Sequence, residues 1–510
     1  MNPKNSHCMN KVRYISLLCL LFCSVAVSAQ TYERVLRNNL WNESENITGV
    51  RQDTVSSSYA EAFAGYEGGG FRDSWEAPQG WNAGAKTASI RHFERMTLKG
   101  SFSFVQTEGY DMCGSMSIRP GFYPVDVMEF TPGRKTLQTY AFDGGIAYDL
   151  DAHWRIGAMM DFESANIAKR KDLRHSNWLL DMTVSPGFLY HDGDFAVGAN
   201  YIFKKTGETI EAEQVGNSGQ SYYAFLDKGM MYGVYNIWTG SGLHLQEAGV
   251  KGFPVKDFSN GGAVQLQYKG FFAEAEYLRT AGTIGEKEFI WFRFPGNRVN
   301  AIAGYRHTGE KSQHFARVKF GWNGLVLDET VLEKVTENGV STVIDHGTNR
   351  ILTRSGWSIV PEYEFIANGI MEFKAGLDVD VQNTISSQMY PYAYTQSITE
   401  ASAYFGLLFH TGRFDWGVTG RYGQGWVSEN ENIVDTESGV QTTPFRLEDW
   451  YNWQMEYATA SRTNIGLSLR WNFWKGLYTE AEGTWLHGFD LQHITNPNRY
   501  KAGLAIGITF

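Results

Sequence analysis

Five pairs of acidic residues, each pair two positions apart, are the part of this sequence that could carry chemistry. The pairs are Asp161/Glu163, Glu274/Glu276, Glu362/Glu364, Asp378/Asp380 and Glu480/Glu482. Side chains two positions apart on a β-strand point to the same face, so each pair presents two carboxylates together. Such carboxylates can pair with basic groups, form a ring that selects ions, or hold a divalent cation.

Counting from the expected turns places three of these pairs at one level of the fold, close to four basic residues. Strand register predicts Arg470 opposite Glu480, and it places Lys374 beside Glu362 or Glu364. We interpret this charge layer first as a network of ion pairs that stiffens a watery interior. A selectivity ring for cations or polar solutes and a bound divalent cation are the alternatives, and no metal or cofactor is assigned. The predicted layer comprises Glu274, Glu276, Glu362, Glu364, Glu480, Glu482, Arg317, Lys319, Lys374 and Arg470.

Motifs for enzymatic chemistry are absent from the sequence. It contains no Gly-x-Ser-x-Gly elbow, no Gly-x-x-x-x-Gly-Lys phosphate loop and no His-Glu-x-x-His metal helix. A Ser/His or Asp/His arrangement at the rim is the enzyme alternative, because five histidines fall near expected strand ends. These are His92, His153, His244, His314 and His410. We assign no catalytic residue and predict that the protein is not an enzyme.

The elements that must position these side chains are long alternating strands. Tyr140 to Tyr148 alternates apolar with polar or small residues, a short turn follows, and Trp154 to Phe162 alternates again. Strands of about 9 to 12 residues have the length that a tilted strand needs to cross a bilayer. Short turns alternate with long connections, and aromatic residues recur at strand ends, as in interfacial girdles. The pattern predicts an all-β, antiparallel transmembrane β-barrel.

Seven short turns, with both chain ends on the same side, predict about 16 strands that begin near Arg95. The range 59–93 could add a hairpin, so we leave 14 to 18 strands open. The predicted organisation is a signal peptide at 1–29, an N-terminal plug or periplasmic segment with a possible first hairpin at 30–94, and the barrel at 95–510.

Both chain ends indicate export to the outer membrane. Basic residues, an apolar run and the small residues before Gln30 predict cleavage between Ala29 and Gln30. The last strand carries one apolar face and ends on an aromatic residue, which resembles the C-terminal assembly signal of bacterial outer-membrane barrels. That face comprises Tyr500, Leu504, Ile506, Ile508 and Phe510.

Composition excludes several classes of protein. Beyond residue 29 the chain keeps one cysteine, Cys113, so it predicts neither an internal disulfide nor a cysteine-based metal site. A net charge of −10 argues against nucleic acid as a partner. No stretch after the predicted leader is apolar enough for a membrane-spanning helix.

Two resemblances to known families add expectations. The segment Ala168 to Arg174, followed by Asn177, Leu180-Asp181 and Pro186-Gly187-Phe188, is similar to a hairpin of a family of large Gram-negative outer-membrane barrels of unknown function. Leu173 stands where that family commonly has proline. The stretch Asn46-Ile-Thr-Gly49 resembles the N-terminal hatch motif of FadL-type transporters, with Ile47 and Thr48 in place of Pro and Ala. The resemblances imply a fold and a location.

We therefore predict an integral outer-membrane barrel that serves as a channel or transporter for solutes. The alternative is a structural or accessory subunit of a larger outer-membrane complex. The expected partners are outer-membrane lipid and the barrel-assembly machinery, with other outer-membrane proteins or small solutes as further candidates. The membrane prediction requires the side chains of Leu504, Ile506, Val197 and Trp416 to face outward.

Overall fold

The computed structural model describes Tyr32, Leu36 and residues 39–510, except 214, 216–222, 229–234, 240–251, 339, 368, 388–392 and 431–446. The predicted signal peptide and its cleavage point, Ala29 and Gln30, lie outside the described residues.

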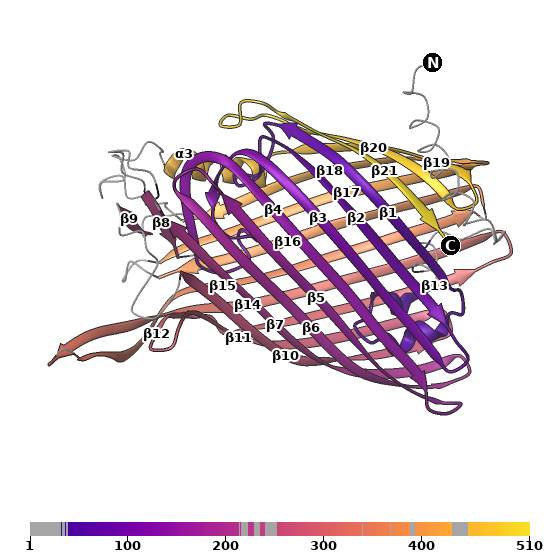
Figure 1. Cartoon of the computed structure of the whole chain (residues 1–510). Helices are drawn as coiled ribbons and strands as arrows, with labels where there is room; N and C mark the ends of the chain where they lie inside the picture. The colour runs from indigo at the N-terminus through magenta and orange to yellow at the C-terminus, as the bar shows by residue number, and fades with distance from the viewer. Residues whose placement is uncertain are drawn as a thin grey trace, which may run out of the picture.

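Eighteen antiparallel strands of the described chain form one closed barrel (Figure 1). The first and last strands pair with each other, for example Ala62 with Ile506, so the sheet has no open edge. In order around the wall the strands are β1 (Ser57–Gly69), β2 (Gln79–His92), β3 (Met96–Ser115), β4 (Asp126–Asp149), β5 (Trp154–Lys169), β6 (Arg174–Asp192), β7 (Phe195–Glu213), β10 (Phe253–Tyr268), β11 (Phe271–Glu286), β13 (Gly296–Thr308), β14 (Ser312–Glu337), β15 (Val340–Ala367), β16 (Met371–Ser386), β17 (Tyr394–Thr411), β18 (Phe414–Glu429), β19 (Arg462–Trp474), β20 (Leu477–Gly488) and β21 (Asn498–Thr509).

The predicted count of about 16 strands was wrong because β1 and β2 belong to the barrel wall. The wall therefore begins at Ser57 rather than near Arg95. The outward positions of β1 are occupied largely by small residues, Ala60, Ala62 and Ala64. Because alanine differs little in hydrophobicity from its small and polar neighbours, the alternation along β1 is weak. The sequence pattern therefore predicts this hairpin only as a possibility.

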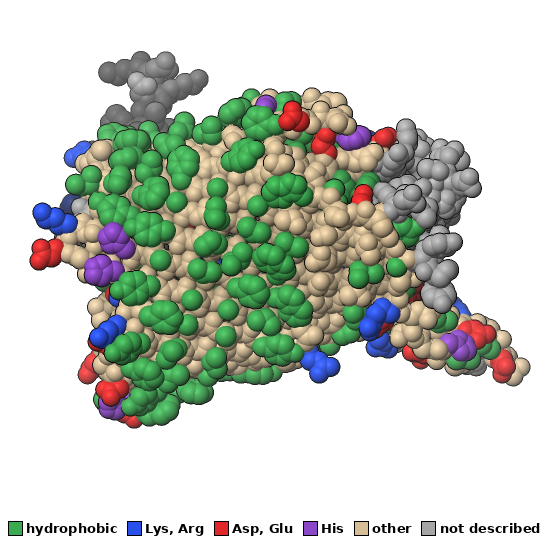
Figure 2. Space-filling model, turned by 180° about the vertical axis from the view of Figure 1, so that it is seen from behind, with side chains coloured by type: hydrophobic (Ala, Val, Ile, Leu, Met, Phe, Trp, Pro, Cys, Tyr) green, Lys and Arg blue, Asp and Glu red, His purple; other side chains and the backbone are tan. Residues whose placement is uncertain are grey.

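Outward-facing side chains of the wall are apolar, as the sequence predicts. Leu504 is 67% exposed, Ile506 57%, Val197 41% and Trp416 40%. Apolar side chains cover much of the outer wall (Figure 2). Inward positions of the same strands carry polar and charged groups. This arrangement of a closed sheet, apolar outside and polar inside, is that of an outer-membrane-type barrel.

The apolar outer wall makes a test of the membrane assignment possible on β20 and β21. We expect Leu504→Arg to lower the free energy of unfolding from lipid vesicles by about 2–4 kcal/mol, because it places a charge against hydrocarbon. Glu482→Arg introduces the same side chain at an exposed inward position and serves as the control. Urea titration followed by tryptophan fluorescence measures both. Equal effects of the two substitutions would contradict a lipid-facing Leu504.

Additional elements lie at the two ends of the barrel. The end that carries the C-terminus has short turns, and the other end has long connections (Figure 1). At the short-turn end are two 3-10 helices, η2 (Leu40–Glu43) and η3 (Ile47–Gln52). At the long-loop end are β8 (Tyr223–Asp227), β9 (Tyr235–Thr239), β12 (Phe289–Arg293) and α3 (Leu447–Thr459). Within the described residues, no helix has the length and apolar character needed to cross a membrane.

Strands β14 and β15 extend far past the rest of the wall as one projecting hairpin (Figure 1). The sequence pattern predicts a long connection at residues 323–356, but most of this range continues the two strands in the structure.

Candidate functional site

Residues 39–53, called here the N-terminal segment, fold against the inner wall at the short-turn end. The side chain of Asn39 accepts a hydrogen bond from the Trp41 amide at 3.1 Å and caps η2, and Asn46 caps η3 in the same way. Trp41 is 1% exposed, and its ring lies 5.2 Å from that of Phe272. Its indole N–H donates to Gln267 of β10. The segment is therefore held by a buried aromatic anchor.

Glycines on four consecutive strands form the seat of this segment. They are Gly145 on β4, Gly157 on β5, Gly187 on β6 and Gly198 on β7. A Cβ on Gly187 would lie 2.6 Å from the side-chain oxygen of Asn46, and one on Gly157 would lie 2.7 Å from Ile47. Since real Cβ atoms do not approach so closely, the wall lacks side chains where the segment approaches it.

Polar side chains of the wall complete the seat. Asn46 is fully buried and donates from its amide to Gln265 at 2.9 Å and to the Phe188 carbonyl at 3.2 Å. Ser44 donates to the carboxylate of Glu274, which also accepts from Gln265 at 2.9 Å. Every buried polar group named here therefore has a partner across the interface, as stable burial requires.

Ion pairs fasten both ends of the segment. Arg51 lies 2.6 Å from Asp149, and its guanidinium also donates to the carbonyls of Phe93 and Glu94 in the β2–β3 turn. At the other end, the carboxylate of Glu43 pairs with Arg317 and, at 2.6 Å, with Lys319.

The predicted charge layer appears as separate groups. Arg317 and Lys374 both pair with Glu362, the latter at 2.5 Å, and Tyr404 donates to the same carboxylate at 2.7 Å. Lys319 joins this group through Glu43. Glu364 is directly opposite Lys374 in the strand register and is buried.

The remaining predicted residues occupy other parts of the wall. Glu274 contacts the N-terminal segment, and Glu276 accepts from Asn300 at 2.7 Å. Arg470 lies 3.1 Å from Glu480, in the predicted register, and Glu482 faces Gly503 on the neighbouring strand. Among the described residues, no group of three or more His, Cys, Asp or Glu side chains is placed to hold a metal ion.

Glu45, a carboxyl between η2 and η3, is a site residue that the sequence pattern does not predict. Burial, followed by the nearby carboxylates of Asp161, Glu276 and Glu274, raises the pKa of Glu45 to about 7, with Lys204 opposing the shift. One of its oxygens is buried without a hydrogen-bond partner. At neutral pH this group therefore lies near the midpoint of its titration.

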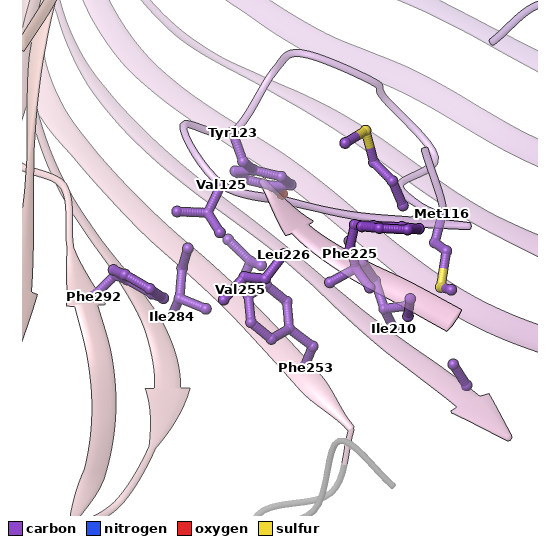
Figure 3. Close-up of a cluster of buried hydrophobic side chains, with 14 of the residues drawn as sticks. Met116, Tyr123, Val125, Ile210, Phe225, Leu226, Phe253, Val255, Ile284 and Phe292 are labelled. Atoms are coloured by element: carbon purple, nitrogen blue, oxygen red, sulfur yellow. The ribbon is translucent and has the colours of Figure 1, made fainter. Parts of the chain in front are cut away.

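Apolar residues close the long-loop end from the inside. Residues 116–125 and β8 pack against inward positions of β7, β10 and β11 (Figure 3), and α3 joins the same buried cluster through Trp450 and Tyr451. Phe225 of β8 is 2% exposed, and Ile284 of β11 is fully buried. The ring of Trp450 on α3 lies 5.0 Å from that of Phe130. We call residues 116–125, β8 and α3 the loop-end closure.

Hydrogen bonds and ion pairs attach the loop-end closure to the wall. The carboxylate of Glu208 accepts from the Ser117 hydroxyl at 2.9 Å and from the Ile118 amide at 2.7 Å. Arg119 pairs with Asp181 at 2.6 Å and with Glu163 at 2.9 Å. The predicted acid pair Asp161/Glu163 contributes to both ends of the barrel. Glu163 pairs with Arg119 of the loop-end closure, and Asp161 is near Glu45 of the N-terminal segment.

A cavity of about 680 Å³, called here the chamber, lies between α3 and the inner faces of β16 to β19. Five carboxylates and three guanidinium groups line it, together with amide, hydroxyl and aromatic side chains. The Arg421 guanidinium is 3.3 Å from Asp378, and both side chains are more than a third exposed. Arg462 pairs with Glu400 and lies 5.4 Å from the ring of Tyr457. The predicted pair Asp378/Asp380 faces this chamber.

Residues 48–510 match the model of a family of unknown function, DUF6850. The chain belongs to this family. None of the curated proteins matches it in sequence.

Solved structures similar to this DUF6850 chain are large barrels of low sequence identity. The siderophore receptor PiuA from Acinetobacter baumannii is 7% identical with a TM-score of 0.41, covering 89% of this chain and 82% of that one. A mutant of the ferric enterobactin receptor PfeA from Pseudomonas aeruginosa is 8% identical with a TM-score of 0.40, covering 89% and 80%. The copper transporter OprC is 8% identical with a TM-score of 0.39, covering 89% and 80%.

The hairpin motif noted in the sequence, between Ala168 and Phe188, contacts both the loop-end closure and the N-terminal segment. Lys169 lies 2.6 Å from Glu129 beneath the loop-end closure, and Asn177 donates to the Met116 carbonyl at 2.6 Å. Asp181 holds Arg119, while Gly187 lies under Asn46 of the N-terminal segment. The stretch Asn46 to Gly49 thus lies in the lumen, and its resemblance to FadL-type transporters stays a prediction.

Four of the five histidines considered for catalysis have described partners, and His244 lies outside the described residues. The ring of His92 is 2.9 Å from the Thr97 hydroxyl, and that of His153 is 3.1 Å from the His191 carbonyl. Both ring nitrogens of His410 face carboxylates, Asp415 at 2.7 Å and Glu372 at 3.2 Å. His314 is 3.1 Å from the Ser312 hydroxyl and 2.7 Å from that of Tyr363. Ser312 and His314 are two positions apart on one strand, a spacing that brings neighbouring side chains of one face together in any sheet.

Proposed function

We propose that this DUF6850 chain is an outer-membrane barrel that passes a solute through its lumen and is closed at rest. The observation that carries the proposal is an open polar chamber within a closed 18-strand wall. A barrel of this size encloses more volume than its wall side chains fill. The N-terminal segment occupies part of that volume at one end, and the loop-end closure occupies part at the other.

The N-terminal segment acts as the periplasmic gate in this proposal. It is attached by a buried tryptophan, a set of polar contacts and two groups of ion pairs, rather than being part of the wall sheet. A segment held this way can be displaced without breaking the hydrogen bonds between the strands of the wall. The charge groups around Glu362 and Glu274 then serve as the docking surface, in addition to stiffening the wall.

The proposal includes a location and partners. We propose that the protein resides in the outer membrane after removal of residues 1–29, with lipid against the outward apolar side chains. The exposed face of β21, with Leu504 and Ile506, is the surface offered to the barrel-assembly machinery. A role as an accessory subunit would leave the chamber without a use.

Reversing the charge of Arg51 is the experiment that tests the proposal. Arg51→Glu removes the pairing with Asp149, whose side chain is 22% exposed, and puts two carboxylates together. Removing one partner of a buried ion pair costs about 3–5 kcal/mol. Because this pair is partly exposed, we expect a cost at the lower end of that range. About 3 kcal/mol shifts the equilibrium between docked and released segment by about 100-fold. Solute flux into proteoliposomes and conductance in planar bilayers measure the increase.

Arg170→Glu is the matched control, because Arg170 is exposed at the long-loop end and far from the segment. It makes the same change of charge, and flux should remain at the wild-type level. If Arg51→Glu leaves flux at that level as well, the N-terminal segment is not a gate.

A further inference from the structure

The chamber carries a chemistry that identifies a class of ligand. We propose that it binds a neutral polyhydroxylated solute, such as a short oligosaccharide, an inference that rests on the proposed transport function. The volume of about 680 Å³ falls within the range of about 300–1,000 Å³ typical of ligand pockets.

The inner wall of the chamber is open to solvent. Asp380 and Gln382 both point inward from β16, yet both side chains are exposed. Asp378 and Arg421 beside them are 37% and 47% exposed. Hydrogen-bonding groups at these positions therefore face free space within the barrel, where a solute can reach them.

The charges of the chamber disfavour an anion. Carboxylates outnumber guanidinium groups among the lining residues. Two of the three guanidinium groups, those of Arg421 and Arg462, are already paired with Asp378 and Glu400. An anion would have to break these pairs and approach further carboxylates. An apolar ligand is disfavoured as well, because it would remove water from these charged groups without replacing their hydrogen bonds.

The same pairs favour hydroxyl groups over a cation. Each hydroxyl both donates and accepts a hydrogen bond, so two neighbouring hydroxyls match a guanidinium donor placed beside a carboxylate acceptor. A cation would use only the carboxylates and would be repelled by Arg421 and Arg462. The amides of Gln382, Gln454 and Asn464 add further groups that both donate and accept.

Aromatic side chains complete the surface that such a solute needs. Tyr457 of α3 and Trp75 of the β1–β2 connection line the chamber together with these polar groups. An aromatic face packs against the C–H face of a sugar ring, while its polar neighbours bind the hydroxyl groups. Burial, followed by the neighbouring Glu76 carboxylate, raises the pKa of Asp73 to about 6, so this lining carboxyl is partly protonated in mildly acidic solution.

Calorimetric titration of the full chain in detergent tests the ligand class. The probes are three neutral trisaccharides of different composition (maltotriose, xylotriose and mannotriose), spermidine as a cation and inorganic phosphate as an anion. We expect at least one trisaccharide to bind. Asp380→Ala and, separately, Gln382→Ala should each weaken that binding by about tenfold or more, because each removes a hydrogen-bonding group. Glu482→Ala, an exposed inward carboxyl outside the chamber lining, should leave it unchanged.

The possible results separate this inference from the transport proposal. Binding of spermidine or phosphate alone, no binding of any trisaccharide, or sugar binding insensitive to both chamber variants would overturn the ligand class. If flux rises in Arg51→Glu while no trisaccharide binds, the transport proposal stands and the ligand class fails. If a trisaccharide binds at the chamber while Arg51→Glu leaves flux unchanged, the ligand class stands and the gate fails.

Discussion

Replacing Gly49 by alanine is expected to release the N-terminal segment and to raise the conductance of the barrel by about two orders of magnitude. The added Cβ would lie 2.0 Å from the ring of Trp41, and neither partner can move away cheaply, because the indole is rigid and 1% exposed. Overpacking a buried site costs about 1–3 kcal/mol, and about 2.8 kcal/mol corresponds to a 100-fold change in an equilibrium.

The measurement is single-channel recording in planar bilayers, with Trp41→Ala as a second variant. Losing the buried indole costs about 3–5 kcal/mol of docking free energy, so both variants should open the barrel by opposite changes of volume. Gly207→Ala on β7 is the control, because its new Cβ would meet its nearest neighbour at an ordinary 3.6 Å. A closed barrel in both segment variants would show that the lumen is sealed elsewhere.

The fold could be predicted from the sequence wherever the outward residues are large. The strand from Tyr500 to Phe510 alternates bulky apolar with small or polar residues, and its outward side chains are exposed as expected. The first hairpin obeys the same geometry, but Ala60, Ala62 and Ala64 give little contrast with their neighbours. Lipid tolerates alanine on the outside of a barrel, since its side chain is also apolar, so low contrast does not argue against a strand.

The ion pairs within hairpins could also be predicted, because register in a tight hairpin is fixed by its turn. Arg470 pairs with Glu480 for this reason, and Lys374 lies opposite Glu364 and pairs with Glu362. The ion pairs that Glu43 makes could not be predicted from hairpin register. It reaches Arg317 and Lys319 from a segment with no strand periodicity, and no local rule relates positions that far apart in sequence.

The chamber could not be predicted from the sequence either, because it is also formed by segments that lie far apart in the chain. Asp378 and Asp380 are an evident pair, but the sequence does not show that α3 folds over them. The sequence pattern predicts a long connection over residues 423–461, which contains α3. The position of the helix depends on distant contacts such as Trp453 donating to the Arg72 carbonyl at 3.0 Å. Four wall glycines were a readable signal for the segment seat, since glycine inside a strand often marks the close approach of another backbone.

Closure of the barrel should depend on pH through Glu45. Its pKa is about 7 in the docked segment, against an ordinary value of 4.5 once the segment is released into water. A group whose pKa is raised by docking favours the docked state when protonated. The contribution of Glu45 to docking is therefore complete below about pH 4.5, falls as pH rises to 7 and is lost above that. Each pH unit within this window changes the docking free energy by about 1.4 kcal/mol.

Conductance should therefore rise steeply between pH 5 and 7 and level off above 7, and Glu45→Gln should hold the barrel closed across the whole range. Recording both proteins from about pH 5 to 9 measures the difference, which should reach about 100-fold near neutral pH. The charged groups that face Glu45 are Asp161, Glu274 and Glu276, with Lys204 opposing them. If Glu45→Gln keeps the wild-type pH dependence, one of these wall carboxyls controls closure instead. Glu482→Gln, which changes an exposed carboxyl away from the segment, should retain the full dependence and shows that a general loss of lumen charge is not the cause.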